Sequence, residues 1–381
     1  MNPGTVEQWG RRQIMLDKGK ISAFQMGIMM YPTVVVTGIL LLPSLLAQAV
    51  GRDFWLSPVW GAAGGYFIVW ICCWLYKRYP NQSIVQYSER IIGKIPGKLA
   101  GLLIIWFYLQ LNGYVVREYG ELLVGAFFPR TPILLVMGSL LLVSACAVRG
   151  GVEVLGRSAQ LFVPVVCLLF VLVVLLLIKE LDLRNIIPIM EDGMMPSLLG
   201  SLVPFGGWYG EFLIISFLLP SLTDSNKGMK WAMVSNSLIM FTMVVTNLVV
   251  LTLFGNAAPR TIYPMLEAAR YIEYGDFLEH VEAVVMAIWI LGVFVKISMF
   301  YYVVVIGASQ WLKLADFRML IFPVGLLVLI LTVWGAASLQ ELAHTIGTAG
   351  PFYYATIQYL LPVILAATAW VRKQAQSGDL R

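Results

Sequence analysis

Two ionisable side chains lie deep within apolar segments of the chain, where charged groups are rare. Lys296 stands in the middle of residues 283–307, and Glu211 follows a glycine-rich stretch within residues 200–219. A buried charge needs a partner of opposite sign, carbonyl ligands or a change of protonation. The pair could form a structural salt bridge, act as a proton-linked switch, or place a fixed cation in an ion site together with Ser298. The sequence leaves these three alternatives open.

Proline and glycine punctuate two apolar segments near their middle, at residues 31–43 and 202–211. Proline removes a backbone donor, and glycine adopts irregular dihedral angles easily. Irregular backbone within a membrane persists only where it is buried in protein or lines a cavity. We predict unwound turns whose free N–H groups bind a carboxylate and whose free carbonyls bind an ammonium, as a zwitterionic amino acid requires. A kink that serves only helix packing is the alternative.

The residues around these two breaks, with an i, i+4 polar pair from residues 99–121, form the predicted ligand site. The alternative for the polar pair, Tyr108 and Asn112, is a packed contact. Arg117, Glu118 and Glu121, further along the same segment, are interpreted as anchors at the level of the lipid headgroups. The predicted ligand-binding residues are Thr33, Val36, Thr37, Gly38, Tyr108, Asn112, Pro204, Phe205, Gly206, Gly207, Trp208 and Glu211.

The composition is that of a membrane protein. Of the 381 residues, 59% are hydrophobic and only 12% are charged, whereas soluble domains carry about 25% charged residues. The four cysteines and two histidines show no metal-ligand spacing. We therefore expect no metal, no cofactor and no enzymatic activity. The net charge of +5 is attributed to membrane topology, so nucleic acid is not an expected partner and the lipid bilayer is.

The apolar residues fall in blocks of the length that crosses a bilayer. The expected fold class is an all-α polytopic membrane protein with ten transmembrane helices. With both termini in the cytoplasm, about three times as many lysine and arginine residues lie inside as outside, which sets the orientation. Residues 265–281 are expected to form an amphipathic helix outside the membrane. The predicted spans are 24–46, 57–76, 99–121, 133–148, 160–178, 200–219, 231–254, 283–307, 319–337 and 351–371.

The ten spans are expected to form one transmembrane domain, residues 24–371, between cytoplasmic segments 1–23 and 372–381. The two punctuated segments occupy corresponding places in two five-span halves, 24–178 and 200–371. Because five is odd, the halves have opposite orientations. This pattern is typical of an inverted repeat with a binding site at the membrane midplane between broken helices 1 and 6.

Several motifs along nearly the whole chain resemble the GerAB family, the B subunits of bacterial spore germinant receptors, within the amino acid/polyamine/organocation transporter superfamily. The most specific run is residues 276–279 followed by residues 289–297. Relatives often have arginine after Phe-Leu-Glu, where this chain has His280, which puts in doubt a charged contact at that point. The other matching stretches are residues 37–43, 92–94, 116–118, 131–132, 149–157 and 204–211.

This resemblance implies a LeuT-type fold with a germinant site, usually for an amino acid, formed by spans 1, 3, 6 and 8. It also implies assembly with an A subunit and a lipoprotein C subunit in the spore inner membrane, which is a bacterial cytoplasmic membrane. By analogy with that fold, the Lys296 ammonium is expected to occupy a cation site between spans 1 and 8 in place of sodium. A proton-coupled amino acid permease that uses the same pocket remains the alternative function.

Overall fold

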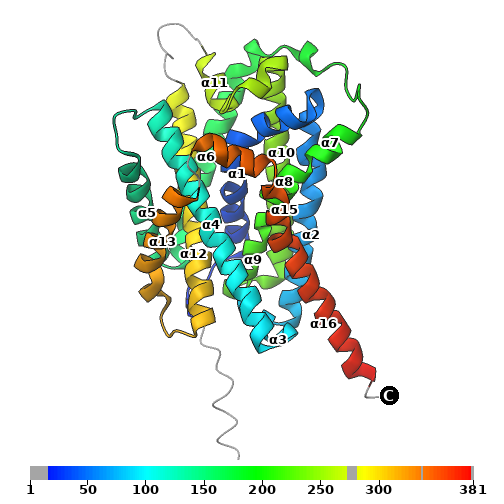
Figure 1. Cartoon of the computed structure of the whole chain (residues 1–381), viewed down its shortest axis with the longest axis vertical. Helices are drawn as coiled ribbons and strands as arrows, with labels where there is room; N and C mark the ends of the chain where they lie inside the picture. Colours follow the sequence, from blue (N-terminus) through cyan, green and yellow to red (C-terminus); the bar gives the residue numbers. More distant parts are fainter. Residues whose placement is uncertain (1–15, 273–280, 336–337, 379–381) are drawn as a thin grey trace, which may run out of the picture.

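The computed structural model describes residues 16–272, 281–335 and 338–378, which form a bundle of helices aligned with its long axis (Figure 1). Among the described residues, the β structure is one isolated parallel bridge between Ile21 and Leu222. The long helices are α1 (Ala23–Val50), α2 (Ser57–Arg78), α4 (Lys94–Ala126), α5 (Ile133–Arg149), α6 (Val152–Leu177), α10 (Gly228–Phe254), α12 (Glu282–Leu312), α13 (Ile321–Trp334) and α16 (Leu361–Gly378). The short ones are α3 (Ile84–Ile92), α7 (Met195–Gly200), α8 (Leu202–Gly207), α9 (Ile215–Leu218), α11 (Pro264–Arg270), α14 (Leu339–Gly347) and α15 (Gly350–Ala355).

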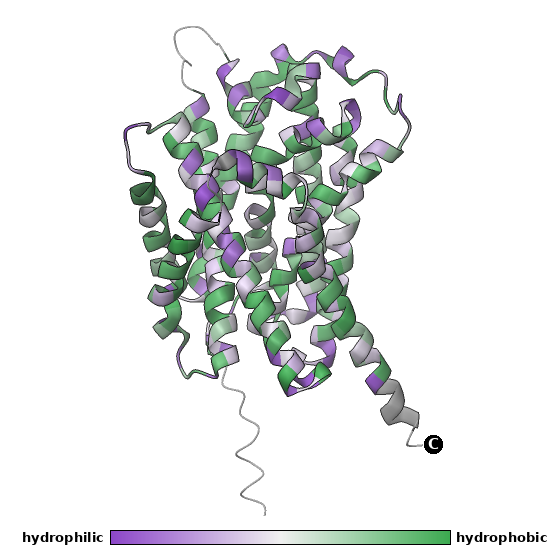
Figure 2. Cartoon of the chain, in the orientation of Figure 1, coloured by the Kyte–Doolittle hydropathy of each residue, from purple (hydrophilic) through white to green (hydrophobic). Residues whose placement is uncertain are grey.

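Eight helical stretches in the described part of the chain are long and apolar enough to cross a membrane. The first of them contains both α1 and α2, joined by a 3₁₀ turn at Arg52–Leu56, while the apolar α5 is shorter than the other stretches. Each of the ten predicted spans overlaps a helix, although ten remains a predicted number of crossings. Figure 2 shows apolar residues along the helices and hydrophilic residues gathered toward the two ends of the bundle.

Helix α1 is the central element of the bundle, and it packs against α6, α10 and α12. The predicted interruption of the first span is absent, because α1 is α-helical from Ala23 to Val50 with Pro32 and Pro43 inside it. The Thr33 hydroxyl donates to the Met29 carbonyl of its own helix at 2.7 Å. Packing of a continuous helix is therefore the correct interpretation of residues 31–43.

The sixth predicted span does change its helix type near its middle. The α-helical turn α8 ends at Gly207, and a 3₁₀ segment follows at Tyr209–Ile214 before α9. The backbone N–H of Trp208 donates to the Pro204 carbonyl, and that of Glu211 donates to the Trp208 carbonyl, both at 3.1 Å. These two amides are therefore already bonded within the segment and are not the free donors that the sequence predicted.

Two further expectations concern the segments outside the long helices. The amphipathic helix expected at residues 265–281 is seen as the shorter α11, and residues 273–280, which include the Asp276–His280 motif, lie outside the described residues. Residues 16–22 of the expected N-terminal segment lie against the bundle. The Asp17 carboxylate accepts hydrogen bonds from the Val152 backbone at 2.8 Å and the Tyr302 hydroxyl at 3.1 Å.

Candidate ligand site

A buried ion pair joins α12 to the 3₁₀ segment of the sixth span, as one of the sequence alternatives predicts. The Lys296 Nζ atom lies 2.8 Å from Oε1 and 3.0 Å from Oε2 of Glu211, and 2.9 Å from the Thr37 hydroxyl on α1. The two charged side chains are only 1% and 2% exposed. The three contacts match the three protons of an ammonium group, so Lys296 is fully engaged.

The Thr37 hydroxyl connects a fourth side chain to this ion pair. It accepts a hydrogen bond from the Trp208 indole Nε1 at 3.0 Å, in addition to the one from Lys296. Trp208 stands where α8 gives way to the 3₁₀ segment. The network thus ties α1 and α12 to the 3₁₀ segment of the sixth span, and the mutual neutralisation of Lys296 and Glu211 makes their burial tolerable.

A small cavity of about 30 Å³ lies beside this network. Such a space holds about two water molecules, so an amino acid fits only after the surrounding helices move apart. The walls come from α1, α4, α8 with its 3₁₀ continuation, α12, α14 and α15. The lining residues are Thr37, Leu111, Tyr114, Val115, Glu118, Gly207, Trp208, Glu211, Lys296, Ile346 and Tyr354.

Glu118 is the main residue of this cavity that the sequence interpretation misplaced. Its side chain is 3% exposed, its Oε1 atom has no hydrogen-bond partner, and it lines the cavity, so its assignment to the lipid headgroups is wrong. The neighbouring Arg117 and Glu121 instead pair with each other at 2.6 Å with partial exposure. The i, i+3, i+4, i+7 spacing of Leu111, Tyr114, Val115 and Glu118 is the signal that could have placed it.

Two tyrosine hydroxyls add uncharged polar groups to the cavity wall. The Tyr354 Oη atom is buried without a hydrogen-bond partner, and the Tyr114 Oη accepts a hydrogen bond from Gln110 at 2.8 Å. Both residues come from outside the motifs that the sequence singled out. A ligand in this cavity would therefore meet one unpaired carboxyl group, two hydroxyls and an internally neutral ion pair.

Five of the predicted site residues line the cavity, namely Thr37, Gly207, Trp208, Glu211 and Lys296. The other predicted residues of α1 are not among the lining residues. Thr33 bonds to its own helix, as described above. Val36 and Gly38 make close helix contacts instead, since a Cβ atom on Gly292 would lie 2.2 Å from Val36 and one on Gly38 would lie 2.4 Å from Met243.

The remaining predicted residues surround the site without lining the cavity. Phe205 stacks on Tyr359 with ring centroids 4.2 Å apart, and Pro204 and Gly206 pack closely against α2 and α15. Four polar atoms are buried without a hydrogen-bond partner, namely the Tyr108 and Ser298 hydroxyls and both amide atoms of Asn112. The structure therefore does not bring Ser298 to the ion pair, although it stands two residues from Lys296.

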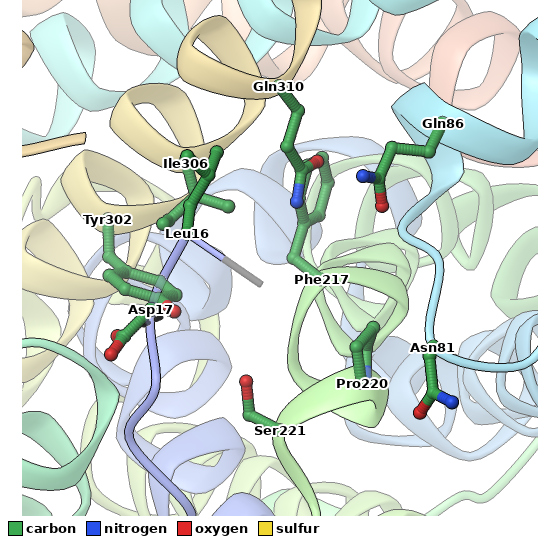
Figure 3. Close-up of a pocket in the computed structure, with 10 residues that line it drawn as sticks. All are labelled: Leu16, Asp17, Asn81, Gln86, Phe217, Pro220, Ser221, Tyr302, Ile306 and Gln310. Carbon is green, nitrogen blue, oxygen red and sulfur yellow. Dashed lines mark hydrogen bonds between the residues drawn. The ribbon is translucent and has the colours of Figure 1, made fainter. Parts of the chain in front are cut away.

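A second small pocket, also of about 30 Å³, lies at the end of the bundle that holds residues 16–22. Figure 3 shows Asp17 beside Tyr302, and the amide groups of Gln86 and Gln310 directed into the space between them. Ser221, from the end of the sixth span, also lines it. Unlike the first cavity, its one carboxylate, Asp17, is already hydrogen-bonded. Within the described ranges, no group of three or more His, Cys, Asp or Glu side chains could hold a metal ion.

The comparisons with known proteins agree on family and fold. Residues 20–338 match the family described as "Spore germination protein". The chain is 29% identical over 375 residues to spore germination protein KB of Bacillus subtilis (strain 168), which covers 95% of this chain and 98% of that protein.

Solved transporter structures share the fold at low sequence identity. A Na⁺-coupled sialic acid symporter in a substrate-bound outward-open state has a TM-score of 0.66 and 12% identity, over 91% of this chain and 89% of that chain. MhsT in complex with L-phenylalanine has the same TM-score and identity, over 91% of this chain and 97% of that chain. The molecule therefore has the LeuT-type fold of these transporters.

Proposed function

Because the chain belongs to the spore germination protein family, whose model covers residues 20–338, we propose that it is the germinant-sensing B subunit of a spore germination receptor. A small amino-acid-like germinant binds in the cavity beside Lys296 and Glu211. The observation that supports this proposal most directly is the small cavity, which is walled by helices from both halves of a transporter fold and contains an unpaired carboxyl group.

Ligand binding acts on the equilibrium between two arrangements of the helices. A ligand that contacts α1, α4 and the 3₁₀ segment together stabilises the arrangement in which these elements enclose it. The change is passed to an A subunit and a lipoprotein C subunit in the spore inner membrane, with both termini of this chain in the cytoplasm. The Lys296 ammonium holds the place that a sodium ion takes in sodium-coupled relatives of this fold.

The test is a thermal-shift screen of the purified full chain in detergent against the twenty common amino acids. A ligand that binds only the folded state raises the melting temperature in proportion to the logarithm of its concentration once binding saturates. We expect at least one amino acid to do so, and no shift with any of them contradicts the proposal.

A proton-coupled amino acid permease is the alternative, favoured by the transporter fold of the structural relatives. Uptake of the radiolabelled stabilising amino acid into proteoliposomes, with and without a pH gradient, separates the two functions. A sensor binds without net accumulation, whereas accumulation driven by the gradient shows that the chain is a transporter.

A further inference from the structure

We infer that Glu118 is the residue that binds the cationic amine of the ligand, and that the ligands of this chain are small aliphatic molecules with a primary ammonium group. This inference rests on the proposed function and specifies its ligand class. It starts from the charges that face the cavity, which are those of Glu118, Glu211 and Lys296.

Glu211 is not available to a ligand amine. Both of its carboxylate oxygens already accept hydrogen bonds from Lys296, at 2.8 and 3.0 Å. Lys296 is not available to a ligand carboxylate either, because its third proton is directed at Thr37. The two side chains therefore neutralise each other, and Glu118 is left as the single uncompensated acid among the described residues that line the cavity.

The Glu118 carboxyl group is placed in an environment that favours a cationic donor. It is 3% exposed, and its Oε1 atom lacks a hydrogen-bond partner. A buried polar group without a partner costs free energy, and a buried carboxylate costs more unless it is paired. A primary ammonium group supplies both the opposite charge and the hydrogen-bond donors, and hydrogen bonds between charged groups are the stronger ones.

The rest of the wall indicates what the amine is attached to. Leu111, Val115 and Ile346 provide apolar surface, which fits a short aliphatic chain. The Tyr354 hydroxyl, buried without a partner, is an uncharged donor for a further polar group of the ligand. Among the described residues, Lys296 is the only cation on this wall and it is already paired, so a ligand carboxylate meets no free positive charge from them. The ammonium group is therefore required for binding, and the carboxylate is secondary.

The experiment measures thermal shifts of the purified full chain with two matched sets of ligands. One set is L-alanine, ethylamine and propionate, and the other is L-valine, isobutylamine and isovalerate. Potassium and sodium chloride serve as controls for inorganic cations. We expect at least one amine to stabilise the protein, and neither the acid of the same set nor either salt to do so.

The same titrations are repeated with Glu118→Gln, which keeps the size of the side chain and removes its charge. We expect amine binding to weaken about tenfold to a hundredfold, the loss of one charge-assisted hydrogen bond. The matched control is Glu121→Gln, one turn along α4, whose partner is Arg117 and which does not line the cavity. This control should bind like the parent protein.

The possible outcomes separate the ligand class from the function. The inference is overturned if an acid or an inorganic cation stabilises the parent protein as strongly as the matching amine does. Because this comparison uses only the parent protein, it holds even if Glu118→Gln fails to fold. Unchanged amine binding by Glu118→Gln also overturns the inference. In both cases stabilisation by an amino acid would leave the proposed function standing. If no compound of either set and no amino acid binds, the function and the inference fall together.

Discussion

At the scale of single residues, depth in an apolar segment identified Lys296 and Glu211, because a charge far from water needs a partner. The sequence could not show that the Thr37 hydroxyl accepts hydrogen bonds from both Lys296 and Trp208, because this depends on how α1 is rotated within the bundle. The same limit applies to Glu118. It stands beside Arg117 and close to Glu121, so its chain neighbours indicate a polar surface, and only the packing of α4 shows that it turns inward.

The Lys296–Glu211 pair makes a residue-level prediction. Replacing Lys296 by methionine removes the partner of a carboxylate that is 2% exposed, and breaking such buried pairs costs about 3–5 kcal/mol. We expect Lys296→Met to lower the melting temperature of the purified protein markedly. The double variant Lys296→Met/Glu211→Gln, which leaves no lone charge, should regain more than half of that loss. A single variant as stable as the parent would show that the pair is not needed for stability.

At the scale of elements, proline and glycine have different effects on the backbone in two of the spans. In α1, Pro32 and Pro43 are accommodated in a continuous helix, and Gly38 provides room for Met243. In the sixth span, proline and glycine accompany a real change from α to 3₁₀ geometry. Composition could not separate these cases, because the outcome depends on neighbouring helices. Gly206 and Gly210 are places where such neighbours, Pro351 and Gln358, come unusually close.

The element-level prediction concerns this close approach in the 3₁₀ segment. A Cβ atom on Gly210 would lie 1.8 Å from the Gln358 side chain, which belongs to a π-helical turn at Thr356–Leu360. We expect Gly210→Ala to destabilise the protein by about 1–3 kcal/mol, as other overpacked substitutions do. Gly138→Ala in α5 is the control, because its Cβ would have no neighbour within 4 Å. We expect Gly210→Ala to lower the melting temperature, and Gly138→Ala to raise it or leave it unchanged.

At the scale of the whole molecule, the sequence was sufficient for the fold class and for the family. Long apolar blocks can be satisfied only by helices in a membrane, and the matching motifs run through most of the chain. What the sequence could not show is how residues 16–22 attach to one end of the bundle. Residues 16–22 are predicted to belong to a cytoplasmic segment, and the sequence does not show that Asp17 accepts hydrogen bonds from Val152 of α6 and Tyr302 of α12.

The attachment of residues 16–22 gives a prediction for the whole bundle. Asp17→Ala removes the acceptor for Val152 and Tyr302, so the end that contains the second pocket should open more often. The measurement is the rate at which a maleimide labels Ser221→Cys, a residue lining that pocket, after replacement of the four native cysteines by alanine. We expect faster labelling with Asp17→Ala. Asp316→Ala, which removes the ion pair with Arg318 and the hydrogen bond from the Arg318 backbone, should leave the rate unchanged, and equal rates for both would contradict the prediction.

The covalent attachment of the Lys296 ammonium to its own backbone has a consequence for the proposed function. The occupancy of a site by a dissolved ion depends on the concentration of that ion in the surrounding medium, so a bundle held by such an ion responds to the salt outside. Lys296 cannot diffuse away from Thr37 and Glu211, and its local concentration is the same in every medium. Under the proposed sensing function, this ion pair does not respond to changes in the sodium concentration outside, and binding of an organic ligand is the event that shifts the bundle.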